Sequence, residues 1–94
     1  MIVLNVTYKL KPDLREEFLE AIQREGIDES SRAEAGNLKY AYYLPYDDNG
    51  DLLLLEKWED ADALRSHGQT AHLKRLSELK KQYVNETIIE RFEA

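Results

Sequence analysis

The sequence contains no cysteine, and this absence excludes several kinds of site at once. Without cysteine the chain has no disulfide framework, no cysteine-ligated zinc and no thiolate nucleophile. A metal ion would have to be bound by the two histidines and by carboxylates. The four glycines are isolated, so neither a G-x-G-x-x-G motif nor a phosphate-binding P-loop is present. We therefore predict no cofactor and no bound metal.

Basic residues are fewer than acidic ones, with 13 Lys and Arg against 19 Asp and Glu and a net charge of −6. A negative chain is repelled by a phosphate backbone, so we predict no nucleic-acid partner. Long apolar runs are also missing. Residues 1–7 lack a basic region and alternate apolar with polar side chains, which indicates a strand rather than an export signal. We expect a cytoplasmic protein that binds no membrane.

The length of 94 residues predicts one domain, residues 1–94, because half of this length would not bury a core without disulfides or metal. Hydrophobic residues make up 43% of the chain and charged residues 34%. This composition is typical of a folded globular domain and not of a disordered segment.

Hydrophobic periodicity divides the chain into strands and helices. Asp60 and Thr70 are suitable helix caps, and Asn49-Gly50 predicts a hairpin turn. The apolar stripe of the first helix is lost after Gly26, so we expect a bend or break there and a polar segment over residues 27–35. The predicted strands are 2–11, 38–44, 52–59 and 84–92, and the predicted helices are 13–26, 61–67 and 70–83.

This order of elements predicts an α+β fold of the ferredoxin-like, split βαβ type, with a four-stranded antiparallel sheet. Both helical connections belong on the same side of the sheet, which leaves its other face bare. Residues 52–55 are four consecutive leucines and therefore offer leucine to both faces. An exposed apolar face of this size requires a cover. We predict a homodimer in which two sheets pack face to face.

Residues 55–74 hold the only tryptophan and both histidines. Alternation places Glu56 beside Trp58 on one face, so a buried Glu56 must be paired, or neutral with a raised pKa. A purely structural interpretation is also open: Trp58 in the core, Glu56 in an ion pair, and His72 satisfied by a backbone carbonyl. His67 and His72 are five residues apart and form no HExxH motif, so the pattern favours no metal site.

Basic residues gather in the last predicted helix of this acidic chain. The simpler interpretation is a solvated helix face with cations near a helix C-terminus. The alternative is that one or more of them attract an anionic small molecule. These residues are Lys74, Arg75, Lys80 and Lys81.

Several short motifs follow one another along nearly the whole chain. They are Met1-Ile2-Val3, Lys11-Pro12, Arg15-Glu16-Glu17-Phe18, Glu34-Ala35-Gly36-Asn37-Leu38, Glu56-Lys57-Trp58-Glu59-Asp60, Ala63-Leu64-Arg65-Ser66-His67 and Gln69-Thr70-Ala71-His72. In this combination, above all E-x-W followed by A-L-x-x-H-x-x-x-x-H, the sequence resembles the antibiotic biosynthesis monooxygenase family. The resemblance implies a dimeric α+β barrel with a pocket between the sheet and the helices.

Members of this family oxygenate phenols and quinols without a cofactor, degrade haem, or isomerise a small phosphorylated sugar. The resemblance implies that Asn5 and Trp58 point into one pocket, and it puts His67 near the position from which haem-degrading relatives bind iron. We predict a cofactor-independent monooxygenase that acts on a small aromatic quinol or phenol and O2. The alternatives are a non-oxidative isomerase or small-molecule binding protein, and a haem-degrading monooxygenase.

Oxygenation of a phenol requires a base, polar groups that orient the anion, and a pocket that excludes water. A histidine is the natural base because imidazole titrates near pH 7. We therefore expect activity to decrease as the pH is lowered and the histidine becomes protonated. By family position Asn5 would bind the oxyanion, Trp58 would stack on the ring, and Glu56 would orient a histidine or act as the base itself. The predicted catalytic residues are His67, Asn5 and Trp58, and the predicted substrate-binding residues are Tyr40, Glu56 and His72.

Overall fold

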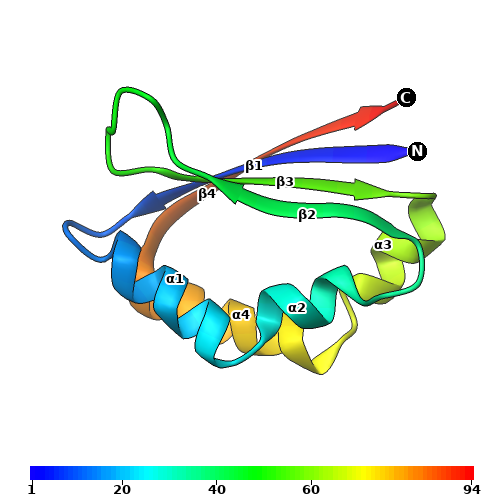
Figure 1. The fold of residues 1–94 in the computed structure, drawn as a ribbon, viewed down its shortest axis with the longest axis horizontal. Coiled ribbons are helices and arrows are strands. Elements are labelled where there is room, and N and C mark those ends of the chain that lie inside the picture. Colours follow the sequence, from blue (N-terminus) through cyan, green and yellow to red (C-terminus); the bar gives the residue numbers. More distant parts are fainter.

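Four strands form one antiparallel sheet in the computed structural model, which describes residues 1–94. Four helices cover one face of the sheet and leave the other face open (Figure 1). The predicted α+β ferredoxin-like fold is confirmed. The elements are β1 (Ile2–Leu10), α1 (Arg15–Arg24), α2 (Ile27–Arg32), β2 (Asn37–Tyr43), β3 (Leu52–Trp58), α3 (Ala61–His67), α4 (Ala71–Tyr83) and β4 (Val84–Glu93).

The strand order is β2-β3-β1-β4, and each neighbouring pair is antiparallel. In the central pair Leu4 lies opposite Glu56, and Val6 lies opposite Leu54. Because side chains alternate between the two faces of a sheet, these four residues and Trp58 share one face. All five are buried, which identifies this face as the one against the helices.

Aromatic residues join the sheet to helices α1 and α4. The ring of Phe18 in α1 meets Tyr8 of β1 edge to face, with ring centroids 5.5 Å apart, and Tyr83 of α4 at 5.7 Å. Phe18, Ala21 and Ile22 are fully buried and form the apolar stripe that the sequence predicts for the first helix. These contacts pack α1 and α4 against each other and against the sheet.

The break after the first helix lies at Gly26, as predicted. Gly26 has φ of 68°, a left-handed conformation that glycine adopts without strain, and α2 begins at the next residue. The following segment is not the purely polar stretch that we expected, because it forms a short helix with buried Ile27, Asp28 and Ser31. A helix of six residues is too short to show a recognisable hydrophobic period, and Ile27 is its one large apolar side chain in the core.

The predicted caps of the last two helices are confirmed. The Asp60 carboxylate accepts a hydrogen bond from the Ala63 backbone N–H at 2.8 Å, and the Thr70 hydroxyl accepts one from the Leu73 N–H at 3.3 Å. The helix predicted over residues 61–67 forms at those residues. These caps fix where α3 ends and α4 begins, and both histidines lie at this junction.

The open face of the sheet carries apolar side chains from all four strands. Leu53 and Leu55 of β3 are half-buried, whereas Ile88 and Phe92 of β4 are 40% and 53% exposed.

No helix combines the length and the apolar character needed to cross a membrane.

Candidate functional site

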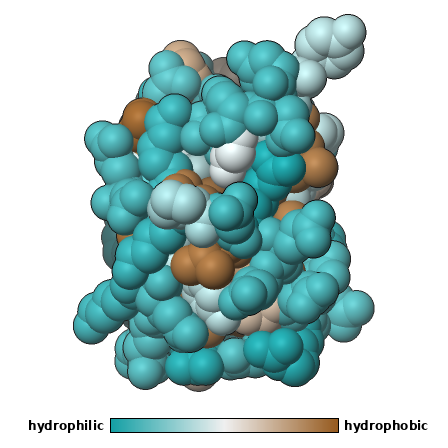
Figure 2. Space-filling model, turned by 90° about the vertical axis from the view of Figure 1, so that its left-hand side faces the viewer, coloured by the Kyte–Doolittle hydropathy of each residue, from teal (hydrophilic) through white to brown (hydrophobic).

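One depression of the surface is polar and does not resemble a catalytic site. It has a volume of about 740 Å³ and lies between the β1–α1 and β2–β3 connections, at the largely hydrophilic end of the molecule seen in Figure 2. Four of its charged side chains are already paired, because Lys9 lies 2.7 Å from Asp51 and Arg15 lies 2.8 Å from Asp48.

The second depression, a cavity of about 230 Å³, lies between the sheet and the last two helices. Most of its wall is apolar, with a few polar groups that converge on it, and this combination is typical of ligand sites. An apolar cavity of about 150 Å³ holds a benzene ring, so this volume suits one ring with small substituents. The lining residues are Leu4, Val6, Tyr8, Tyr40, Glu56, Leu64, His67, Gly68, Leu73, Leu76, Ser77, Lys80, Thr87 and Ile89.

Gly36 brings the segment before β2 against α3. Its φ of 84° favours glycine, and a Cβ atom at this position would lie 2.5 Å from the Cβ of Ala63. Its carbonyl accepts a hydrogen bond from the Glu59 N–H at 2.8 Å. This close approach carries Glu34, two residues earlier, to the end of α3 where His67 lies.

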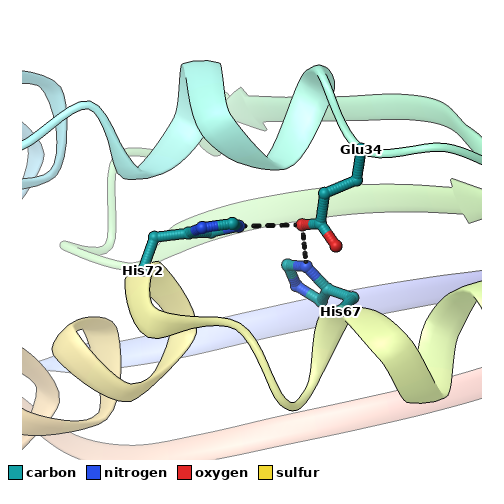
Figure 3. Close-up of side chains that lie close together, drawn as sticks. All are labelled: Glu34, His67 and His72. Atoms are coloured by element: carbon teal, nitrogen blue, oxygen red, sulfur yellow. Dashed lines mark hydrogen bonds and ion pairs between the residues drawn. The ribbon is translucent and has the colours of Figure 1, made fainter.

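The turn between α3 and α4 presents both histidines to the same carboxylate (Figure 3). His67 is the last residue of α3, and His72 is in the first turn of α4. Nδ1 of His67 lies 2.5 Å from Oε2 of Glu34, and Nε2 of His72 lies 2.8 Å from the same oxygen. The three side chains therefore form one hydrogen-bonded cluster, in which His67 is buried and His72 is 20% exposed.

The shared oxygen determines which histidine nitrogens carry hydrogen. An ionised Glu34 can only accept hydrogen bonds, so Nδ1 of His67 and Nε2 of His72 each donate one. In a neutral imidazole this leaves Nε2 of His67 with a free lone pair. That nitrogen faces Oε1 of Glu56 at 3.8 Å, which is too long for a hydrogen bond. His67 thus has one nitrogen held by Glu34 and one available as a base.

Glu56 and Trp58 pack around His67. The indole N–H of Trp58 donates a hydrogen bond to Oε1 of Glu56 at 3.0 Å, and its ring lies 4.6 Å from the His67 ring. Burial raises the pKa of Glu56, although the Trp58 hydrogen bond and the nearby His67 act in the opposite direction. Trp58 is fully buried and does not line the cavity. It contacts Glu56 and His67, which do.

Tyr40 extends the cavity wall beside His67. Its ring lies 5.8 Å from the His67 ring, and it is buried. Burial raises the pKa of Tyr40 to about 12, with a further contribution from Glu56, so its hydroxyl stays protonated at neutral pH. Tyr40 can therefore donate a hydrogen bond but does not act as a base.

The Glu34, His67 and His72 ligand atoms lie within 4.8 Å of one another, and two imidazoles with one carboxylate are a set that binds transition metals. Ligands about 2.1 Å from one metal ion lie roughly 3.0–3.4 Å apart. The two nitrogens are 2.5 and 2.8 Å from the carboxylate oxygen, closer than this range. The cluster therefore has the geometry of direct hydrogen bonds, and a metal ion would require the Glu34 oxygen to move away.

Asn5 is the predicted site residue that the structure places elsewhere. It lies opposite Leu55 and Glu90, on the open face of the sheet, and its side chain donates a hydrogen bond to Glu90 at 3.3 Å. Trp58 is on the opposite, buried face, so the prediction that the two share a pocket is wrong. The cause is strand parity, because Asn5 is odd-numbered on a strand whose even-numbered residues face the helices.

The other predicted residues come together around one point. Tyr40, Glu56 and His67 line the cavity, whereas Trp58 and His72 contact the cavity residue His67 or its partner Glu34 from outside. Whether these residues act in catalysis stays a prediction.

Two further residues belong to this arrangement. Glu34 belongs to no periodic pattern, and its one sequence signal is the Glu34–Leu38 segment, which carries part of the family resemblance but assigns no role to this carboxylate. Tyr8 follows the strand alternation of β1 and would be assigned to the core from sequence. The sequence does not show that Glu34 lies close to α3, because this proximity arises from the packing of Gly36 in the tertiary structure.

The comparison with known proteins agrees with the fold and with the sequence motifs. The family model described as "Antibiotic biosynthesis monooxygenase" matches residues 1–79. The Bacillus subtilis (strain 168) protein "Putative monooxygenase YcnE" is 42% identical over 72 residues, which are 77% of this chain and 74% of that protein.

Solved structures of similar proteins cover the full length of the chain. PA3566 from Pseudomonas aeruginosa has a TM-score of 0.82 at 27% identity, covering 99% of this chain and 92% of its own. A protein from Nitrosomonas europaea has a TM-score of 0.89 at 23% identity, covering 100% and 98% respectively, and shows the same fold.

Proposed function

The chain belongs to the antibiotic biosynthesis monooxygenase family, and we propose that it is a monooxygenase that acts on a quinol or phenol without a bound cofactor. The observation that carries this proposal is the Glu34–His67 pair at the wall of a mostly apolar, one-ring cavity. A histidine whose second nitrogen is held by a carboxylate is a common form of general base.

In the proposed mechanism, Nε2 of His67 accepts the hydroxyl proton of the substrate. The imidazolium formed lies 2.5 Å from the Glu34 carboxylate, which stabilises the new charge without moving. Trp58, packed on the His67 ring at 4.6 Å, keeps the imidazole in this orientation. The product of this step is a substrate anion held in a mostly apolar cavity.

A quinol anion is electron-rich enough to pass one electron to O2, which reacts only slowly with closed-shell molecules. The two radicals then combine, one oxygen atom enters the ring, and the other leaves as water with the released protons. The quinol itself supplies the electrons that reduce the second oxygen atom, so the reaction needs no external reductant. The apolar residues around the cavity, among them Val6, Leu73 and Leu76, exclude water from the intermediates.

Haem degradation fits this cavity poorly. Its volume of about 230 Å³ is below the roughly 300–1,000 Å³ of sites for drug-sized ligands, and haem is larger than most such ligands. His67 is 3% exposed, and its Nε2 has a carboxylate 3.8 Å away.

A non-oxidative isomerase is the second candidate. The Glu34–His67 pair transfers protons, and proton transfer alone suffices for isomerisation of a carbonyl compound. The two candidates differ in oxygen consumption, which only the monooxygenase requires.

We propose that the protein acts as a homodimer. The open face of the sheet carries Leu53, Leu55, Ile88 and Phe92, and a second copy of the same face would remove them from water. This face is opposite to the cavity, so dimerisation leaves the cavity accessible from the helical side.

The experiment that tests the function is oxygen uptake with a panel of hydroquinones, measured with an oxygen electrode after subtraction of autoxidation. We expect uptake above the autoxidation rate, and its loss in His67→Ala. Turnover of a carbonyl substrate without oxygen uptake would favour the isomerase. If Glu56→Gln abolishes uptake while His67→Ala retains it, the base is Glu56 and the assignment of His67 is wrong.

A further inference from the structure

Of the four basic residues that gather in α4, only Lys80 reaches the cavity. Lys74 and Lys81 are exposed, and Arg75 is neutralised by Glu25, with Nε to Oε1 at 2.5 Å and a second hydrogen bond at 3.0 Å. Three of the four basic side chains, Lys74, Arg75 and Lys81, therefore belong to the outer, solvated part of the helix or to an ion pair on it. Lys80 is the exception and requires its own explanation.

Lys80 is a half-buried cation with no anionic partner. Its Nζ atom lies 5.6 Å from the centroid of the Tyr8 ring, and it forms no ion pair, because no carboxylate lies within 4.0 Å. Burial lowers the pKa of Lys80. Partial removal of an ammonium group from water is unfavourable unless an anion compensates it. The protein itself supplies no such anion at this position.

We propose that Lys80 binds an anionic substituent of the substrate, so that the natural substrate is a single-ring quinol or phenol that carries a carboxylate. This inference rests on the proposed function and assigns the substrate class of the same cavity. Lys80 is the only lysine or arginine among the lining residues, which suits one negative charge and not a phosphate dianion.

The two polar regions of the cavity are well separated, which gives the substrate an orientation. Glu56, beside His67, lies opposite Leu4 on β1, whereas Lys80 lies over Tyr8, four residues further along the same strand. Four residues of strand span roughly 13 Å. A ring held between them would turn its carboxylate toward Lys80 and its hydroxyl toward His67. Glu56 is the only carboxylate in the cavity wall, so repulsion disfavours the reverse orientation.

The test compares three compounds of the same ring: gentisate, which is a hydroquinone with one carboxylate, its neutral methyl ester, and hydroquinone. Affinities are measured by titration calorimetry without oxygen, so that binding is observed in the absence of turnover. We expect gentisate to bind at least about tenfold more tightly than its ester, as a charge-assisted hydrogen bond permits.

Lys80→Met should remove this preference, and Lys80→Arg should retain most of it. Lys81→Met, one residue further along α4 and exposed, is the matched control and should keep the preference. The proposal is overturned if the wild-type protein binds the ester as tightly as gentisate, if it binds none of the three, or if Lys80→Met keeps the preference.

The same samples separate the failure of this inference from the failure of the proposed function. Gentisate binding that depends on Lys80, without oxygen uptake, supports the anion site and contradicts the monooxygenase. Oxygen uptake that is equal for gentisate and hydroquinone, and unchanged in Lys80→Met, supports the monooxygenase and contradicts the role of Lys80.

Discussion

Glu34→Gln isolates the contribution of the carboxylate to the proposed base. Glutamine has nearly the same size and keeps an oxygen that can accept the hydrogen bond from Nδ1 of His67, so the tautomer and the packing are retained. What it removes is the negative charge 2.5 Å from the imidazole. The variant therefore weakens the stabilisation of the imidazolium that forms when His67 takes the substrate proton.

The size of this effect follows from the difference between two kinds of hydrogen bond. A hydrogen bond to a charged group contributes about 1.5–3 kcal/mol and a neutral one about 0.5–1.5 kcal/mol, so the loss is about 1–2 kcal/mol. At a factor of ten for each 1.4 kcal/mol, kcat should fall by about 5- to 30-fold. The assay is oxygen uptake at saturating quinol, with the folded state checked by circular dichroism.

Glu20→Gln is the matched control, because Glu20 is an exposed carboxylate on α1 without an ion pair. It should leave kcat unchanged. If Glu34→Gln keeps kcat within about twofold of the wild-type value while remaining folded, Glu34 does not assist the base, and the argument built on the shared oxygen fails.

Two further predictions concern stability and assembly. Burial raises the pKa of Glu56 above its value in the unfolded chain, so between the two pKa values the folded protein binds more protons and its stability falls as pH rises. The unfolding free energy of Glu56→Gln minus that of the wild type should therefore increase from pH 4 to pH 8 in urea titrations. A difference that stays constant over this range would contradict the raised pKa. Sedimentation at micromolar concentration should give twice the chain mass of 11.0 kDa, and Phe92→Asp should return it toward one chain mass. A wild-type monomer would refute the proposed dimer.

The sequence predicts the secondary structure well because its signals are local. Alternation, helix caps and turn glycines act within a few residues, and the strands that we expected over 38–44 and 84–92 form at 37–43 and 84–93. The short helix α2 is the exception. Its six residues contain one large apolar side chain, Ile27, so a helical periodicity cannot be recognised, and the helix is stabilised by tertiary packing.

The candidate site is predicted less completely, because its parts meet through the tertiary structure. His67 and Glu56 stand out in the sequence through the family motif and through strand alternation. Glu34 also lies in a segment of the family resemblance, but its approach to His67 depends on the contact of Gly36 with Ala63, far along the chain. Hydrogen-bond partners separated by 33 residues, as Glu34 and His67 are, cannot be found from spacing alone.

Asn5 provides a final test of the arrangement, because family position and strand parity assign it different roles. On parity it belongs to the open face, where it donates a hydrogen bond to Glu90 and lies opposite Leu55, with the sheet between it and the cavity. Asn5→Ala should therefore leave kcat/KM for the quinol within about twofold of the wild-type value, while it can weaken self-association. Both quantities are measured on one preparation, by oxygen uptake and by sedimentation. A loss of more than about tenfold in kcat/KM with the dimer intact would mean that Asn5 acts on the substrate, and that strand parity in one chain does not define the site.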